Sequence, residues 1–245
     1  MSILLWILLV TFIDGLIALV GAFSLLISDK ILKKILSTLV AFAAGALLSG
    51  AFFHLLAESI ETMLSTTAFL YLMTGFIAFF LIEKFFHWHH CHDGKCKVHP
   101  VSYLILFGDG VHNFIDGLVI AASFLVSIPF GIVTALLIMG HELPQELGDF
   151  GVLVYSGFTK TKALLYNFIA QLTCLIGGLV GFFVSGLYGF SFLLPFAAGG
   201  FIYIAASDLI PELHKELSLK KSMFHFAFFL IGISFMFLIK YLFGG

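Results

Sequence analysis

The sequence is poor in charged residues. Of its 245 residues, 11% are Asp, Glu, Lys or Arg, whereas 61% are hydrophobic, and the mean hydropathy is +1.13. An ordinary soluble domain has about 25% charged residues, so this shortage excludes that class and indicates a membrane protein with several spanning helices. With a formal net charge of −2 and no visible basic patch, the sequence gives no indication of a nucleic-acid partner.

Cysteine is scarce as well, with three residues in the chain. Cys174 lies within an apolar run, where packing is its expected role. Cys91 and Cys96 lie in a histidine-rich segment, where thiolates are expected to bind metal rather than to form a bridge. The cysteine pattern therefore does not predict a disulfide framework.

The N-terminus lacks the cationic residues that begin a signal peptide, and Asp14 interrupts its apolar run. We therefore expect that run to be a retained first span, followed by seven more runs of about the length that crosses a bilayer. The pattern predicts an all-α integral membrane protein with about eight transmembrane helices in a single domain over residues 1–245. The predicted spans are Ile3–Ile27, Ile35–Ser59, Ala68–Phe86, Val101–Val126, Pro129–Tyr155, Ala163–Leu187, Phe190–Leu213 and Met223–Phe243.

Lysine is confined almost entirely to alternate links between these spans. The second, fourth and sixth links carry no Lys or Arg, and Lys240 near the C-terminus is the exception to the pattern. Because positive residues favour the cytoplasmic side, the odd links are predicted to be cytoplasmic and both termini external. The lysines of the odd links are at positions 30, 33, 34, 84, 95, 97, 160, 162, 215, 220 and 221.

The fifth run has a polar centre that begins with His141 and Glu142. An acidic side chain in the middle of a span costs about 2.5–3.5 kcal/mol on insertion scales, and such groups persist where they face a protein interior, pair or hold an ion. Helical spacing places Gln145 on the face of His141. It places Glu146 and Asp149 on the face of Glu142. A polar seam that joins helices is the alternative to an ion site.

The fourth run has a polar centre of its own, with His112, Asn113 and Asp116 at helical spacing. A short link joins it to the fifth run, so the two helices should be antiparallel neighbours. His112 and His141 each lie about fourteen to sixteen residues from that link, which places both near the midplane. Mixed nitrogen and oxygen donors suit zinc and its first-row neighbours and suit magnesium or calcium poorly. We therefore predict a transition-metal site between these two spans.

An internal repeat relates residues 43–58 to residues 197–212 at a constant offset. The two copies lie on spans that run in opposite directions, and inverted repeats of this kind are typical of transporters. Chance matching of alanine and glycine is the alternative. The repeat predicts a 3+2+3 arrangement, with repeat one at 1–86, a histidine-rich cytoplasmic link at 87–100, a central pair at 101–156 and repeat two at 162–245.

Each copy ends in a polar pair, His54 with Glu58 toward the outer side and Asp208 with Glu212 toward the cytoplasm. Entry and exit stations for a cation are one interpretation, and interfacial capping is the other. Asp14 is a further intramembrane carboxylate, for which a packing hydrogen bond and a proton site both remain open.

The third link is a biased tract of metal-binding residue types. Its ligands lack fixed tetrahedral spacing, which favours loose capture, sensing or buffering of metal over a structural zinc site. A solvated polar loop is the alternative. The candidate ligands are His89, His90, Cys91, His92 and Cys96.

These residues together resemble the ZIP (Zrt-, Irt-like) divalent-metal transporter family, in the branch that carries HNFxDG and HExPHELGD. Residues 112–117 match the first motif fully, and residues 141–149 match the second except at Gln145, where that branch has histidine. The resemblance covers the whole chain. It implies a helical bundle with inverted repeats that imports a divalent metal, with zinc, iron, manganese and cadmium as substrates, by alternating access across the plasma membrane. The ligands that it implies, for a binuclear site with bridging carboxylates, are His112, Asn113, Asp116, His141, Glu142 and Gln145.

An amide oxygen is a weaker and harder ligand than an imidazole nitrogen, so Gln145 is predicted either to loosen one subsite or to tilt the preference toward iron or manganese. Glu146 and Asp149 are predicted secondary ligands. Small-residue surfaces such as Gly177, Gly178 and Gly181 permit a homodimer in the lipid bilayer.

Two other functions compete with transport. An intramembrane zinc metalloprotease is suggested by residues 141–145, which are one residue from HExxH, but Gln145 removes the second histidine that this chemistry requires. A metal sensor or structural membrane protein that does not transport is the other. We therefore expect a transporter with no enzymatic activity and no catalytic cofactor.

Overall fold

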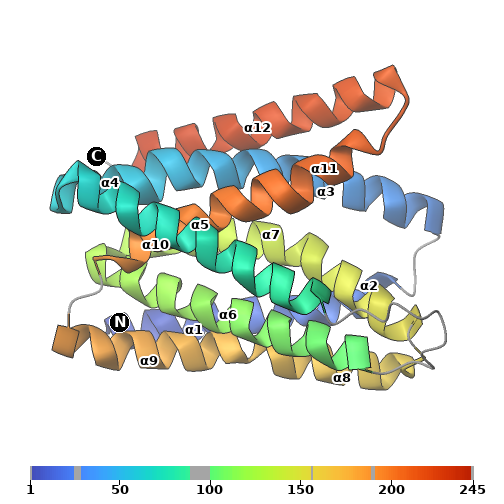
Figure 1. Cartoon of the computed structure of the whole chain (residues 1–245), viewed down its shortest axis with the longest axis horizontal. Helices are drawn as coiled ribbons and strands as arrows, with labels where there is room; N and C mark the ends of the chain where they lie inside the picture. Colours follow the sequence, from blue (N-terminus) through green and yellow to red (C-terminus); the bar gives the residue numbers. More distant parts are fainter. Residues whose placement is uncertain (1, 25–28, 89–99, 156, 189–190, 244–245) are drawn as a thin grey trace.

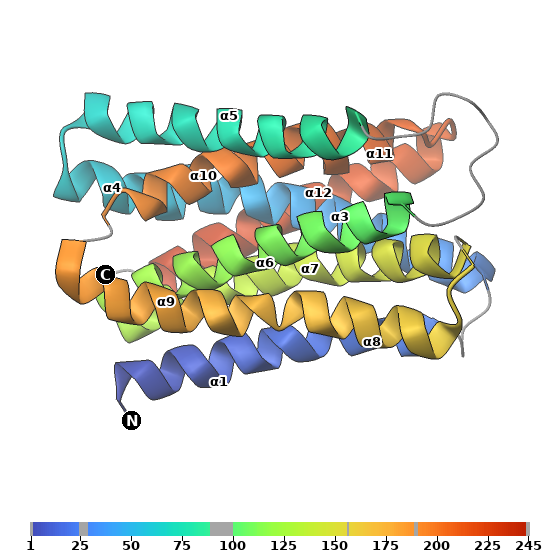
Figure 2. The same cartoon turned by 60° about the horizontal axis from the view of Figure 1, so that its bottom comes forward.

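The structure is a computed structural model, and it describes residues 2–24, 29–88, 100–155, 157–188 and 191–243. Over these ranges the chain is helical, with no strand. The long helices lie side by side along one axis of the molecule (Figure 1, Figure 2). The elements are α1 Ile3–Gly15, the 3₁₀-helix η1 Leu16–Leu19, α2 Val20–Ser24, α3 Asp29–Gly50, the π-helix η2 Ala51–Leu56, α4 Ala57–Thr62, α5 Ser65–Trp88, α6 Pro100–Val126, α7 Ile128–Tyr155, α8 Lys160–Gln171, α9 Thr173–Tyr188, α10 Leu193–Ile204, the π-helix η3 Ala205–Leu209, α11 Ile210–His214 and α12 Leu219–Phe243.

Most of these elements follow one another directly and form continuous helical columns, each of which corresponds to one predicted span. Within the described ranges, seven helical segments are long and apolar enough to cross a membrane: Ile3–Ala22, Lys34–Thr62, Ser65–Lys84, Leu106–Val126, Lys160–Val184, Leu193–His214 and Leu219–Leu238. The eighth column is α7, which has 28 residues and is less apolar because of the polar centre that begins at His141. The prediction of an all-α integral membrane protein is confirmed.

Side-chain caps fix where several helices begin. Ser2 Oγ accepts the backbone N–H of Leu5 (3.3 Å) at the start of α1. Ser127 Oγ accepts the backbone N–H of Phe130 (3.2 Å) at the start of α7. Ser127 is the one residue between α6 and α7, so the link is shorter than expected and the fifth span begins at Ile128 rather than at Pro129.

Glycines allow two equivalent pairs of helices to approach closely. A Cβ at Gly45 of α3 would overlap the backbone carbonyl of Phe229 in α12. A Cβ at Gly199 of α10 would overlap the backbone carbonyl of Leu72 in α5. Close backbone approach at small residues is the usual way in which helices associate within a membrane. Gly45 and Gly199 occupy the same position in the two copies of the repeat.

A π-helix also occurs at the same position of each copy. Ala51 and Ala205 begin η2 and η3, and they stand 154 residues apart, the interval that separates Ala43 from Ala197. Each π-helix inserts an extra residue into the helical register. The predicted i, i+4 stacking of His54 on Glu58 assumed a regular α-helix, whereas His54 lies in η2 and Glu58 follows in α4.

In space, the helices form two halves, and each half combines helices from the N-terminal and the C-terminal parts of the sequence. In both views α3, α5, α10 and α12 lie together, while α1, α6, α7, α8 and α9 form the other half (Figure 1, Figure 2). The first and sixth spans therefore accompany the central pair. The polar centres of α6 and α7 lie inside this arrangement.

Candidate metal centre

Four side chains from α6 and α7 converge near the middle of the two helices: His112, Asp116, His141 and Glu142. One donor atom from each lies within 4.8 Å of all the others. The His112 side chain is 12% exposed, whereas the other three side chains are at most 1% exposed. Spacing of four residues on α6 and one residue on α7 is enough, because the two helices present their polar faces to each other.

The distances within this group match those of a tetrahedral metal site. The Nε2 atoms of His112 and His141 are 3.1 Å apart. Asp116 Oδ2 lies 3.5 Å from the first and 3.4 Å from the second, and Glu142 Oε1 lies 3.3 Å from both. Bonds of about 2.0–2.1 Å to a tetrahedral zinc ion place neighbouring donors about 3.3–3.4 Å apart. Five of the six distances among the four atoms are therefore close to those of a zinc coordination shell.

The buried oxygens of this group lack hydrogen bonds. Asp116 Oδ2 and both carboxylate oxygens of Glu142 are buried without a hydrogen-bond partner. Buried polar atoms are usually hydrogen-bonded, whereas Asp116 Oδ2 and Glu142 Oε1 have ion-pair contacts with the two imidazoles instead. A cation bound between the four side chains would satisfy these oxygens.

Neighbouring groups orient and cover the two imidazoles. His141 Nδ1 lies 3.3 Å from the backbone oxygen of Leu137, so an Nδ1–H donor there leaves Nε2 free to bind metal. Phe79 of α5 packs edge-on against His112, and Phe201 of α10 packs against His141, each with ring centroids 5.6 Å apart. The opposite half of the molecule therefore supplies aromatic walls beside the candidate ligands.

The two amides that were predicted as ligands lie beside this group and face a residue that sequence reasoning missed. Asp109 Oδ1 accepts hydrogen bonds from Asn113 Nδ2 (3.1 Å) and from Gln145 Nε2 (3.2 Å). Asp109 is 5% exposed. It lies three residues before His112 and seven before Asp116, so the helical spacing that identified the others also contained its signal.

A second group of carboxylates adjoins the first. Oxygens of Asp109, Glu142 and Glu146 lie within 4.8 Å of one another, and all three residues are buried. Glu146 also accepts a hydrogen bond from Asn167 Nδ2 of α8. Asp149, a predicted secondary ligand, is half-buried and belongs to neither group of the described residues.

Asp14 has a partner on the sixth span. Gln171 Nε2 donates to Asp14 Oδ2 (3.0 Å), and both residues are fully buried. The contact joins α1 to the end of α8. Of the two interpretations left open for Asp14, the packing hydrogen bond is present in the structure.

The predicted pathway residues lie outside the centre. His54 is buried, its Nε2 lies 3.1 Å from Thr134 Oγ1 of α7, and its ring stacks on Phe130. Glu58 is half-buried. Asp208 and Glu212 are exposed, and Glu212 pairs with Lys215. The predicted loop ligands His89, His90, Cys91, His92 and Cys96 lie outside the described residues.

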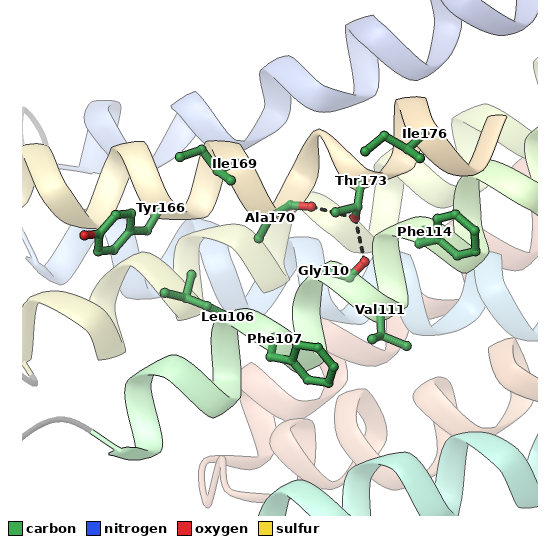
Figure 3. A pocket seen from close by; sticks show the side chains of 10 residues that line it. All are labelled: Leu106, Phe107, Gly110, Val111, Phe114, Tyr166, Ile169, Ala170, Thr173 and Ile176. Atoms are coloured by element: carbon green, nitrogen blue, oxygen red, sulfur yellow. Dashed lines mark hydrogen bonds between the residues drawn. The ribbon is translucent and has the colours of Figure 1, made fainter. Parts of the chain in front are cut away.

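An apolar groove occupies the other side of α6. Its volume is about 710 Å³, and it runs between α6 and the α8–α9 column (Figure 3). The Thr173 hydroxyl contributes to its wall, and its one O–H lies within hydrogen-bond distance of the backbone oxygens of Gly110 (2.5 Å) and Ala170 (2.7 Å). Because apolar side chains form nearly all of the lining, this groove does not suit a cation. Its residues are Leu106, Phe107, Gly110, Val111, Phe114, Tyr166, Ile169, Ala170, Thr173 and Ile176.

Comparison with known proteins bears on the same chain. The family model described as ZIP Zinc transporter matches residues 2–100 and 88–240. "Zinc transporter zipt-7.2" of Caenorhabditis elegans is 40% identical over 149 residues, which are 58% of this chain and 32% of the relative. "IAA-alanine resistance protein 1" of Arabidopsis thaliana is 43% identical over 140 residues, 54% of this chain and 29% of the relative. "Zinc transporter ZIP10" of Homo sapiens is 38% identical over 141 residues, 51% of this chain and 17% of the relative. The matches thus cover less than a third of the length of these curated relatives.

Proposed function

The chain belongs to the ZIP zinc transporter family, and we propose that it carries divalent transition-metal ions, zinc foremost, across the membrane. One observation carries the proposal: two imidazole nitrogens and two carboxylate oxygens are buried between antiparallel spans, and five of their six mutual distances, at 3.1–3.5 Å, are close to those of tetrahedral coordination. The name zinc transporter given to two of the relatives agrees with this substrate.

The donor set favours first-row transition metals over the abundant hard cations. Imidazole nitrogen suits zinc, copper, iron and nickel, whereas magnesium and calcium prefer six or more oxygen ligands. His112 and His141 therefore act as the discriminating ligands. Asp116 and Glu142 supply charge that offsets the loss of water from the ion.

The path that we propose runs from the external side to the cytoplasm. The orientation follows from the lysines of the odd links, which place the start of α6 and the end of α7 on the cytoplasmic side. The four donors of the candidate centre form a mixed group of nitrogen and oxygen ligands, and Asp109, Glu142 and Glu146 form a carboxylate group. Asp109 and Glu146 lie about one helical turn from the mixed group toward the cytoplasmic side, and Glu142 belongs to both groups. An ion that enters past Glu58 and His54 would pass from the mixed group to the carboxylate group and leave toward the third link.

Alternating access requires the two halves of the molecule to shift relative to each other. Phe79 and Phe201 contact the histidines from the half that contributes no ligand to the mixed group. Sliding of these aromatic walls along the centre would open it to one side at a time. The paired π-helices η2 and η3 are candidate points of bending, because π-helices interrupt the regular helical ladder.

The test is metal uptake by proteoliposomes that contain the purified full chain. We expect zinc uptake in the wild type, and in the folded His141→Ala variant we expect no more than in protein-free vesicles, because one of the two nitrogen donors is lost. His225→Ala is the matched control, since His225 is also a buried histidine but lies on α12 away from the ligands. Wild-type uptake by His141→Ala would exclude the proposed centre.

The metalloprotease remains less suited to the geometry. A zincin needs a second histidine four residues after the first, and the residue at that position, Gln145, donates to Asp109. We propose that the chain has no peptidase activity. Zinc-dependent cleavage of a transmembrane peptide by the purified protein, lost in Glu142→Gln, would contradict this.

A further inference from the structure

Asp109 holds two amides at once beside the proposed centre. Its Oδ1 is 3.1 Å from the side-chain nitrogen of Asn113 and 3.2 Å from that of Gln145. The two partners come from different helices, α6 and α7. A single carboxylate oxygen therefore joins the polar faces of both spans.

The chemistry of the amide makes this contact directional. An amide has N–H donors at one end and an acceptor oxygen at the other, whereas an ionised carboxylate accepts only. Both amides must therefore turn their NH₂ groups toward Asp109, and their oxygens must point elsewhere. A metal ion binds an amide through oxygen, so this orientation is the one that makes Asn113 and Gln145 available as ligands.

The side-chain oxygen of Asn113 is available to bind a cation. Asn113 is fully buried, and its Oδ1 has no hydrogen-bond partner. Such an atom is costly unless something satisfies it. It lies on the residue next to His112, in the same turn of α6.

We propose that Asp109 is a positioning residue of the metal centre: it fixes the Asn113 and Gln145 amides with their oxygens toward the ion and so widens the range of metals that the centre accepts. This inference rests on the proposed function. It explains how an amide at position 145 serves in place of an imidazole. Oxygen donors added to the two histidines favour harder ions such as manganese, so Asp109 sets the preference between manganese and zinc through the two amides, without a bond of its own to an ion held by His112, Asp116, His141 and Glu142.

A direct ligand role for Asp109 is the competing explanation. Asp109 Oδ2 is buried without a partner, and the residue lies within the carboxylate group of Glu142 and Glu146. The two roles use different oxygens. Oδ1 orients the amides, whereas Oδ2 would bind an ion.

Two substitutions separate these roles. Asp109→Asn keeps an acceptor oxygen for the amides, and its NH₂ group faces the carboxylates of Glu142 and Glu146, which accept it. Asp109→Leu keeps the branched shape of the side chain and has no acceptor, so both amides are free to rotate. A positioning residue predicts that asparagine preserves function and leucine does not, whereas a ligand through Oδ2 predicts loss in both.

The experiment measures equilibrium binding of Mn²⁺ and Zn²⁺ to the purified full chain in nanodiscs. We expect Asp109→Leu to weaken Mn²⁺ binding by about 10- to 100-fold, the range for residues that orient metal ligands. Zn²⁺ binding should weaken less, because the two histidines and two carboxylates remain. Asp109→Asn should restore Mn²⁺ binding to within about threefold of wild type, on the same scale. Ser123→Ala is the matched control, since it alters another fully buried polar side chain of α6.

A second comparison uses the symmetry of a carboxylate. Both terminal atoms of a glutamate side chain at position 145 are oxygens, so either can bind the ion and no partner has to orient the group. The effect of Asp109→Leu on Mn²⁺ binding should therefore be smaller in a Gln145→Glu background. An effect of unchanged size there would overturn the proposal.

Failure of this inference and failure of the proposed function give different results. If the wild type binds neither metal, or if His112→Ala binds both as the wild type does, the proposed centre itself is wrong. If His112→Ala loses binding while Asp109→Leu keeps the wild-type ratio of Mn²⁺ to Zn²⁺ affinity, only the role of Asp109 is wrong. Loss of Mn²⁺ binding in Asp109→Asn as great as in His112→Ala would overturn it even if the leucine variant does not fold.

Discussion

At the scale of single residues, the centre combines strong ligands with groups that orient them. The four donors of His112, Asp116, His141 and Glu142 are close enough to share one ion. Helical spacing in the sequence placed these donors on facing surfaces, and the amide oxygen of Gln145 was predicted as a further ligand. The structure shows that the nitrogen of this amide is already committed to Asp109, so only the oxygen remains for a metal.

Gln145→His should tighten zinc binding. An imidazole can donate one N–H to Asp109 and present its other nitrogen to the ion, the arrangement in which a carboxylate orients a metal-binding histidine. We expect the Kd for zinc to fall by about tenfold, the scale on which changes in the ligand shell alter affinity. The maximal transport rate should not rise, because an ion held more tightly leaves more slowly.

Competition between zinc and manganese, in binding and in uptake, measures this effect. Gln145→Leu is the matched control, since it removes the amide and adds no donor, and it should weaken binding of manganese. A zinc-to-manganese preference that stays the same in Gln145→His would show that position 145 is outside the coordination shell.

At the scale of helices, close packing at glycine joins the elements that frame the centre. Gly45 on α3 and Gly199 on α10 each approach the backbone of a neighbouring helix so closely that a Cβ has no room. Backbone atoms cannot move aside as a flexible side chain can. Helix contacts of this kind set the positions of α5 and α10, and thereby of Phe79 and Phe201 beside the histidines.

Gly45→Ala should therefore destabilise the protein. Overpacking at a close contact costs about 1–3 kcal/mol, and here the obstacle is the carbonyl of Phe229. Gly151→Ala is the matched control, because it lies within α7 with nothing near the added Cβ, and it should stabilise the protein by about 0.5–1 kcal/mol. Thermal unfolding in detergent compares the two, and equal midpoints would contradict the packing argument.

At the scale of the whole molecule, orientation in the membrane rests on the lysines. The exposed residues Leu64 and Leu217 lie in the second and seventh links, at 79% and 96% exposure. The lysine pattern assigns the second link to the outside and the seventh to the cytoplasm. The direction of import in the proposed mechanism depends on this assignment.

Labelling with a membrane-impermeant maleimide tests the orientation. In chains whose native cysteines are replaced by serine, Leu64→Cys should react on intact cells and Leu217→Cys only after the membrane is opened. The two sites are matched in residue type and high exposure. The reverse labelling pattern would show that the topology is inverted, and it would contradict the proposed direction of transport.

The sequence alone was sufficient to predict the helical membrane class, most of the spans and the pairing of the polar centres of α6 and α7. These features follow from composition, from helical periodicity and from a link too short for any other connection. The polar residues that share a face within each helix were equally visible, because spacings of three and four residues need no knowledge of neighbouring helices.

Only the tertiary structure decided how the groups from different spans meet. The contact between Asp109 and Gln145 depends on the packing of α6 against α7. The contact between Asp14 and Gln171 likewise depends on the packing of α1 against α8. The π-helices at Ala51 and Ala205 were likewise absent from the sequence-based expectation, which assumed uniform α-helix. Periodicity within one helix fixes which side chains share a face, but distances between donors on different helices depend on how closely the backbones approach, and packing between the helices sets that approach.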